Sequence, residues 1–222
     1  MKTLKQSKSA PSSFISTSGY LSSQACNEFL VRLYYGPGED YLVSCIDRAY
    51  LDFNRTLHGF RGHADAGGVR RQATDLIKEG FRALLAIKTL TEGKFDRWHR
   101  GMCDNLRAHF RRAGYGAFSY GQAQKWVNMT MKYVFVLGED RLPGYGVALR
   151  HAHVPIDNIV LETWHPLGMP KLAVAWSRLD DYKIYSGLQA WTRTKFAPRS
   201  PLEAEFWAWI KAREARDDRI GR

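Results

Sequence analysis

The chain has 222 residues, which suits one large domain or two small ones with a hydrophobic core. Its 33 Lys and Arg against 22 Asp and Glu give a net charge of +11, which favours a polyanionic partner, nucleic acid first. The alternative is a solvated basic surface with no partner. The three widely spaced cysteines indicate neither a disulfide framework nor a zinc site, and no apolar run is long enough to predict a membrane span.

The first half of the chain predicts a flexible arm followed by four helices. Residues 1–20 are basic and rich in serine, with no continuous apolar segment of the kind that a secretory signal carries. Apolar residues then recur at helical spacing, and glycine or proline clusters separate the runs. We expect helices over residues 22–35, 40–57, 69–90 and 95–113.

The second half predicts four more helices. Residues 121–137 are apolar nearly all round, so this helix should be central. Pro155 and Pro201 each occupy a favoured first helical position, and a further helix should cover 180–194. No stretch shows the alternation typical of a strand. We therefore predict an all-α protein of about eight helices, with residues 21–215 forming one helical domain or two subdomains and 216–222 a charged tail.

Histidines occur in two clusters that invite a functional reading. His58 and His63 lie in a Gly-rich loop but lack fixed ligand spacing and a nearby cysteine, so we expect no metal and no cofactor. His151 and His153 directly precede the VPID sequence. They are open to two interpretations, assistance at a reactive site or a structural role.

Lys125 and Asp157 are the two residues with the clearest chemical potential. Lys125 lies near the start of the central helix, and we expect Asp157 in the first turn of the next helix. Burial lowers the pKa of a lysine and frees its amine as a nucleophile. The dipole of the helix start keeps a carboxylate ionised, which suits the stabilisation of a cationic centre. Each residue alone is also consistent with a purely structural role.

A basic surface precedes this pair. The segment 95–113 is rich in arginine and leads into a turn that contains two glycines. Backbone N–H groups of such a turn and arginine side chains can hold phosphates. The residues predicted to contact a nucleic-acid backbone are Arg107, Arg111, Arg112, Gly114 and Gly116.

These features together resemble the helix-hairpin-helix superfamily of DNA glycosylases, and most closely its archaeal 8-oxoguanine DNA glycosylase type. The segment KWVNMTMKYVF at 125–135 is similar to the family's lysine-led helix, and Pro155-Ile156-Asp157 to its Pro-Val-Asp sequence. PLEAEFWAW at 201–209 is similar to a late family helix, with Glu205 where the family has aspartate and Trp209 matching its aromatic residue. The resemblance covers about half of the chain.

The resemblance implies two helical subdomains with a cleft between them, and a bifunctional glycosylase with β-lyase activity. The target base would turn out of duplex DNA, Lys125 would attack C1′ of the sugar, and Asp157 would stabilise the developing charge. Glu205 and Trp209 would contact the extruded base, and Lys132 is the fallback nucleophile. The base that is removed stays open. We expect a monomer in the cytoplasm, associated with the nucleoid in a prokaryote.

Two alternatives remain from the sequence. One is a non-catalytic helical protein that binds nucleic acid, which needs the basic surface but not the Lys125 and Asp157 pair. The other is a helical subunit of a larger complex, for example one for defence, whose charge serves solubility.

Overall fold

The computed structural model describes residues 21–220, with side chains up to residue 211. The expected arm, residues 1–20, and the end of the expected tail, residues 221–222, lie outside the described residues. The described chain divides into two compact units, which meet between residues 39 and 40 of the sequence. The first unit contributes one described helix, and the candidate site lies wholly in the second.

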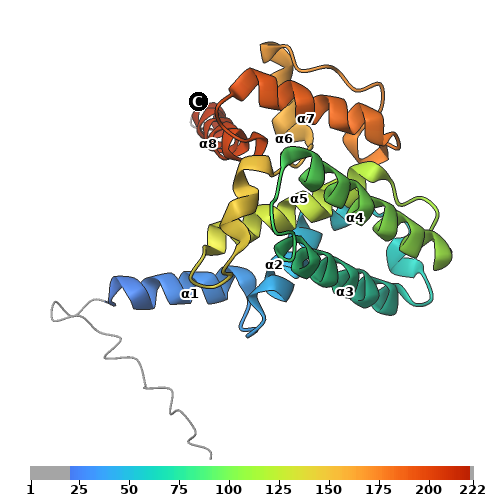
Figure 1. Ribbon diagram of the computed structural model, residues 1–222, viewed down its shortest axis with the longest axis horizontal. Helices are drawn as coiled ribbons and strands as arrows, with labels where there is room; N and C mark the ends of the chain where they lie inside the picture. Colours follow the sequence, from blue (N-terminus) through green and yellow to red (C-terminus); the bar gives the residue numbers. More distant parts are fainter. Residues whose placement is uncertain (1–20, 221–222) are drawn as a thin grey trace, which may run out of the picture. The chain divides into compact units, whose positions relative to one another are not determined.

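The described chain is all-helical, as the sequence predicts, and residues 21–220 contain no strand. Its helices, drawn in Figure 1, are α1 (Ser23–Tyr35), α2 (Tyr41–Phe53), α3 (Ala66–Leu85), α4 (Glu92–Arg112), α5 (Tyr120–Leu137), α6 (Asn158–Trp164), α7 (Tyr182–Phe196) and α8 (Pro201–Ile220). Short 3₁₀ turns cover Asn54–Thr56, Phe60–Gly62, Tyr145–His151, His165–Leu167 and Trp176–Arg178. The finer expectation, a helix-hairpin-helix arrangement with a cleft between subdomains, stays a prediction.

The central helix is α5, as its all-round apolar pattern predicts. Fifteen of its 18 residues are buried, and it packs against α2 on one side and α4 on another (Figure 1). Trp126 is fully buried against the rings of Tyr50 and Phe53, and its indole N–H donates to the carbonyl of Ile46 at 2.9 Å. This burial removes most of α5 from solvent, so polar side chains on it must find partners inside the protein.

The start of α5 is fixed by two local devices. Ser119 and Gln122 form a capping box, in which each side chain accepts a hydrogen bond from the other residue's backbone N–H, at 3.1 and 3.0 Å. Gly121 lies directly under the loop before α7, and its N–H donates to the carbonyl of Leu179 at 2.8 Å. A Cβ at Gly121 would lie 1.7 Å from the carbonyl oxygen of Trp176, so only glycine permits this approach.

Two predicted helix starts need correction. The sixth helix does not begin at Pro155: residues 152–156 are extended and buried, α6 begins at Asn158, and Asp157 is its N-cap, not a first-turn residue. Side chains of other helices pair with this extended backbone, which removes the need for helical hydrogen bonds. The third helix begins earlier than predicted, because Asp65 caps it by accepting from the N–H of Gly68 at 3.0 Å.

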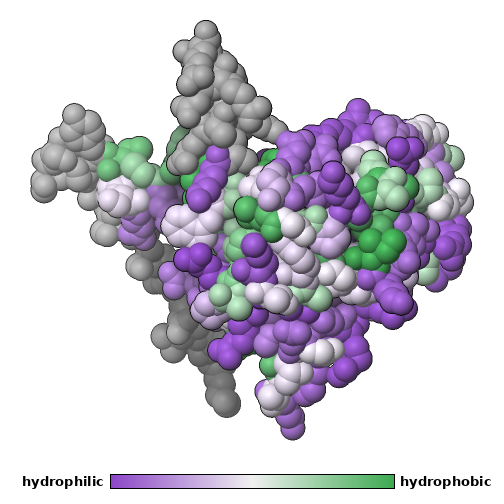
Figure 2. Space-filling model, turned by 90° about the horizontal axis from the view of Figure 1, so that it is seen from above, coloured by the Kyte–Doolittle hydropathy of each residue, from purple (hydrophilic) through white to green (hydrophobic). Residues whose placement is uncertain are grey.

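The face of the molecule that Figure 2 draws is largely hydrophilic and is interrupted by apolar areas. Within the described part of the chain, no helix combines the length and hydropathy that crossing a bilayer requires.

Candidate active site

The structure brings Lys125 and Asp157 into contact across 32 positions of the chain. The Lys125 ammonium lies on the second turn of α5 and donates to Oδ2 of Asp157. The other carboxylate oxygen, Oδ1, accepts from the N–H of Val160 at 3.0 Å and so caps α6. The Lys125 side chain is 6% exposed and that of Asp157 is 17% exposed. The Asp157 carboxylate therefore caps the start of α6 with one oxygen and pairs with the buried Lys125 ammonium through the other.

Gln124 sets the register of this pair. Its side-chain amide matches the backbone of Ile156 on both sides: Oε1 accepts from the Ile156 N–H at 3.0 Å, and Nε2 donates to the Ile156 carbonyl at 2.8 Å. The next residue on each segment is Lys125 or Asp157. A two-point amide contact of this kind fixes the position and direction of the extended backbone, so the two side chains that follow are held together.

Gln189 on α7 makes the same kind of two-point contact with Val154, two residues earlier in the segment. Its Oε1 accepts from the Val154 N–H at 3.0 Å, and its Nε2 donates to the Val154 carbonyl at 2.9 Å. Gln189 and Gln124 are both buried. The extended segment that leads to Asp157 is therefore satisfied by glutamines from two helices, in place of a neighbouring strand.

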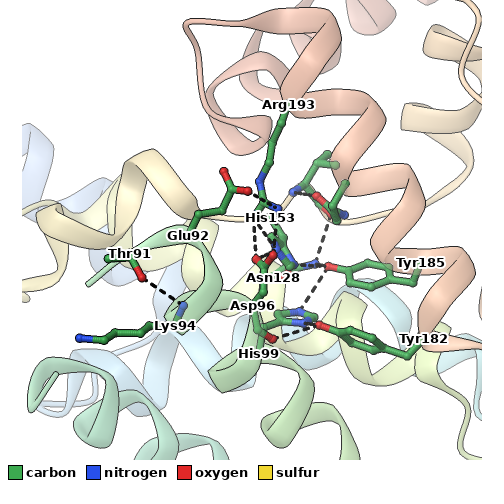
Figure 3. A network of polar contacts seen from close by, with 12 residues as sticks. Thr91, Glu92, Lys94, Asp96, His99, Asn128, His153, Tyr182, Tyr185 and Arg193 are labelled. Carbon is green, nitrogen blue, oxygen red and sulfur yellow. Dashed lines mark hydrogen bonds and ion pairs between the residues drawn. The ribbon is translucent and has the colours of Figure 1, made fainter. Parts of the chain in front are cut away.

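A buried polar network continues from this segment (Figure 3). His153 lies 2.9 Å from the hydroxyl of Tyr185 through Nδ1 and 2.8 Å from Asp96 through Nε2. The Tyr185 hydroxyl also lies 2.8 Å from Nδ2 of Asn128 and 3.3 Å from Nε2 of His99, whose Nδ1 is 2.9 Å from Tyr182. One assignment of protons satisfies these four contacts: Tyr182 donates to His99, His99 to Tyr185, Tyr185 to His153, and His153 to Asp96.

The charges of this network follow from burial and pairing. Desolvation lowers the pKa of His99 well below its ordinary value and also lowers the pKa of His153, so both are neutral near pH 7. Burial alone would raise the pKa of Asp96, but hydrogen bonds from His153 and Arg193 hold it well below its usual range. Arg193 contacts Asp96 with two nitrogens, at 3.0 and 2.6 Å. These groups anchor α4 and α7 to the segment before Asp157.

A second buried ion pair lies further along α5. Nζ of Lys132 is 2.8 Å from Oε1 and 2.6 Å from Oε2 of Glu205, and the two side chains are 11% and 4% exposed. Desolvation raises the pKa of Glu205, although the charges of Lys132 and Lys125 oppose the change. Asp157 also acts on Glu205 electrostatically, so the two pairs form one charged cluster among α5, α6 and α8.

Glu205 and Trp209, predicted to contact a base, therefore lie beside this cluster. The Glu205 carboxylate is engaged by Lys132, which a base would have to share or replace. Trp209 is 42% exposed, and its ring lies 5.8 Å from Nζ of Lys132. The cluster formed by Lys125, Lys132, Asp157 and Glu205 thus has an aromatic ring near its edge.

The residues predicted to contact a nucleic-acid backbone differ in their exposure and in the partners they already have within the protein. Arg111 and Arg112 are exposed at the end of α4. Arg107 is not a free cation, because it pairs with Asp180 at 2.6 Å and lies over the ring of Tyr120 at 3.8 Å. Gly114 has a positive φ of 86°, and its N–H donates to the carbonyl of Arg111 at 3.0 Å. Because that N–H closes the end of α4, it does not face outward for a phosphate, whereas Gly116 has open space around its Cα.

Sequence reasoning missed the residues that position the pair, above all Gln124, Asn128 and Gln189. The signal was present in α5, where three amide side chains, Gln122, Gln124 and Asn128, interrupt a largely apolar helix. A buried amide needs several partners, and an extended backbone supplies them. Among the described residues, no group of three or more His, Cys, Asp or Glu side chains is arranged to hold a metal ion.

Comparisons with known proteins give no assignment: no family model, no curated protein and no solved structure matches the chain.

Proposed function

We propose that this protein is a DNA glycosylase with β-lyase activity, and that Lys125 and Asp157 carry its chemistry. The observation that carries the proposal is the contact between these two side chains, which the resemblance requires and which a separation of 32 positions in the chain does not guarantee. The charge of +11 suits a DNA partner, which we propose binds as a duplex with one base turned out, to a monomer.

The proposed reaction begins with a proton transfer from the Lys125 ammonium to Asp157, which leaves a neutral amine. The amine nitrogen forms a bond to C1′ of the deoxyribose, while the glycosidic bond breaks and its electron pair leaves with the base. The departing base takes a proton from Asp157, and the regenerated carboxylate then accepts a proton from the new secondary ammonium. The protonated Asp157 then gives its proton to O4′ as the C1′–O4′ bond breaks, which opens the sugar ring and leaves a Schiff base. The Asp157 carboxylate accepts the C2′ proton, and the resulting β-elimination breaks the C3′–O bond and expels the 3′ phosphate.

The ion pair supports this chemistry in two ways. It holds the Lys125 ammonium and the Asp157 carboxylate in hydrogen-bond contact before substrate binds, so the proton transfer needs no rearrangement of either side chain. As the departing base takes the proton from Asp157, the carboxylate is regenerated beside the position where positive charge develops on the sugar. Glu205, the other carboxylate of the cluster, offers a hydrogen-bond acceptor for the extruded base. The exposed ring of Trp209 offers a surface on which that base can stack.

A non-catalytic nucleic-acid-binding protein is the second candidate. The observation that favours it is the double use of Asp157, since a carboxylate that caps α6 and neutralises a buried lysine has a sufficient structural reason to exist. A role as a helical subunit of a larger complex stays a further alternative, with no specific contact in its favour.

Base release separates these candidates. The protein is incubated with a set of duplexes, each carrying one damaged or modified base, and free base and nicked strand are measured. The proposal predicts release of at least one base with strand nicking. Salt-dependent binding to all duplexes, without release from any, would support the binding protein instead.

A further inference from the structure

The molecule carries a second concave site that contains neither Lys125 nor Asp157. It is a surface pocket of about 770 Å³ between the first half of α4, the start of α5 and the start of α7. Tyr120, the first residue of α5, lies in its wall. Tyr120 precedes Lys125 by five residues, which is roughly 7.5 Å along the axis of α5.

The carboxylates of this pocket are already engaged within the protein. Asp96 is held by both terminal nitrogens of Arg193, at 3.0 and 2.6 Å. Asp180 accepts from Arg107 at 2.6 Å, and Asp181 caps α7 by accepting from the backbone N–H of Lys183 at 2.7 Å. Their charges are therefore offset by an arginine or directed at a helix start.

The cations of the pocket are far less committed. Arg97 and Lys183 are exposed, and within the described part of the chain neither forms an ion pair. Arg100 is also exposed, and its contact with Asp104 is a long 3.8 Å. Three cationic side chains from α4 and α7 thus converge on one hollow whose acidic groups are satisfied elsewhere.

We infer that this pocket binds a phosphate group, with Arg97 and Lys183 as its principal contacts. A guanidinium offers paired N–H donors that match phosphate oxygens, and an ammonium adds a mobile point charge. The phosphate belongs either to a nucleic-acid strand or to a free nucleotide. The nucleic-acid source rests on the proposed function, whereas the free nucleotide does not.

The test measures affinity without catalysis, using the full chain and an undamaged duplex over a range of salt concentrations. The double variant Arg97→Gln with Lys183→Gln is compared with Lys88→Gln with Lys171→Gln, which removes two exposed charges outside the pocket. A charge-conserving variant, Arg97→Lys with Lys183→Arg, serves as the rescue. Binding of thymidine 5′-monophosphate, and of thymidine without phosphate, is measured in parallel.

If a DNA strand is the ligand, the pocket variant makes the negative slope of log affinity against log salt shallower by about 0.9, since the pocket holds one phosphate and each lost phosphate contact contributes about 0.9. The Lys88 and Lys171 variant changes it much less, and the rescue restores it. If a free nucleotide is the ligand, the monophosphate binds saturably, thymidine does not, and only the pocket variant loses the monophosphate. Equal slopes in the two double variants, with no monophosphate binding, would overturn the inference. Failure of base release would leave these measurements intact, so the two proposals fail separately.

Discussion

Gln124 pairs with both backbone polar groups of Ile156, and this contact places Lys125 against Asp157. The amide of one helix acts toward the extended segment as a neighbouring strand would. The candidate catalytic pair thus follows from the contact between the two residues that directly precede it, the buried side chain of Gln124 and the backbone of Ile156.

Replacing Gln124 by alanine should destabilise the protein and disturb the pair together. The change leaves the N–H and the carbonyl of Ile156 buried without partners, at about 1–3 kcal/mol for each group. Chemical denaturation measures the free energy of unfolding. Gln72→Ala, on the exposed face of α3, is the matched control and should change it by less than about 0.5 kcal/mol. Equal effects in the two variants would show that the Ile156 contact contributes nothing.

Replacing Asp157 by asparagine should separate its capping role from its charge. Asparagine caps a helix about as well as aspartate, so α6 should survive. The buried Lys125 then loses its ion partner, which costs about 3 kcal/mol, and base release should fall by about 10²–10⁴-fold. Asp65→Asn alters the cap of α3, which carries no such ion pair, and is the control for capping alone. Normal base release by Asp157→Asn would contradict the proposed role of the carboxylate.

The stability of the protein should fall as pH decreases below about 6.5. His99 and His153 are kept neutral in the folded state by burial, which lowers the pKa of each, while the unfolded chain takes up protons near pH 6.5. Below that pH the unfolded state binds more protons, so each histidine removes up to about 1.4 kcal/mol per pH unit until its folded pKa is reached. Glu205, whose pKa burial raises, acts in the opposite direction only above about pH 4.5.

Denaturation between pH 5.5 and 7.5 measures this effect. His99→Gln should flatten the profile even where it lowers stability overall, and His58→Gln, at an exposed position, should not. A wild-type profile with no loss of stability across this range would show that neither histidine is held neutral.

Two glycines in helices should respond oppositely to alanine. At Gly121 a Cβ meets the carbonyl of Trp176 at 1.7 Å, so Gly121→Ala must displace the loop before α7 and should cost more than about 2 kcal/mol. At Gly101, on α4, nothing lies within 4 Å of an added Cβ, so Gly101→Ala should stabilise by about 0.5–1 kcal/mol. Thermal melts of the two variants measure these opposite changes in stability. A neutral Gly121→Ala would contradict the close approach.

The sequence predicted the helical class and the central position of α5 because apolar spacing reports directly on which faces are buried. It also predicted that Lys125 and Asp157 meet, through the resemblance. It misplaced the start of α6, because Pro155 is equally compatible with a first helical turn and with extended backbone. What decided between them was Gln124 and Gln189, residues far away in the chain whose pairing with an extended segment leaves no local signal.

The charged pairs could be foreseen only in part. Lys132 and Glu205 were predicted separately, as a fallback nucleophile and as a base contact, and in the structure they engage each other. Spacing along α5 shows that Lys132 shares a helix with Lys125, but the partner on α8 depends on packing between elements distant in sequence. The network of His99, Tyr185 and His153 was missed for the same reason.

The central claim, that Lys125 is the nucleophile, is tested most directly by borohydride trapping on a duplex that carries an abasic site. Wild-type protein should give a covalent adduct, because reduction fixes the Schiff base. Lys125→Gln should give none, and Lys132→Gln, which removes the other buried lysine of α5, should retain it. An adduct that persists in Lys125→Gln and disappears in Lys132→Gln would contradict the assignment, and no adduct with wild-type protein would contradict the lyase chemistry itself.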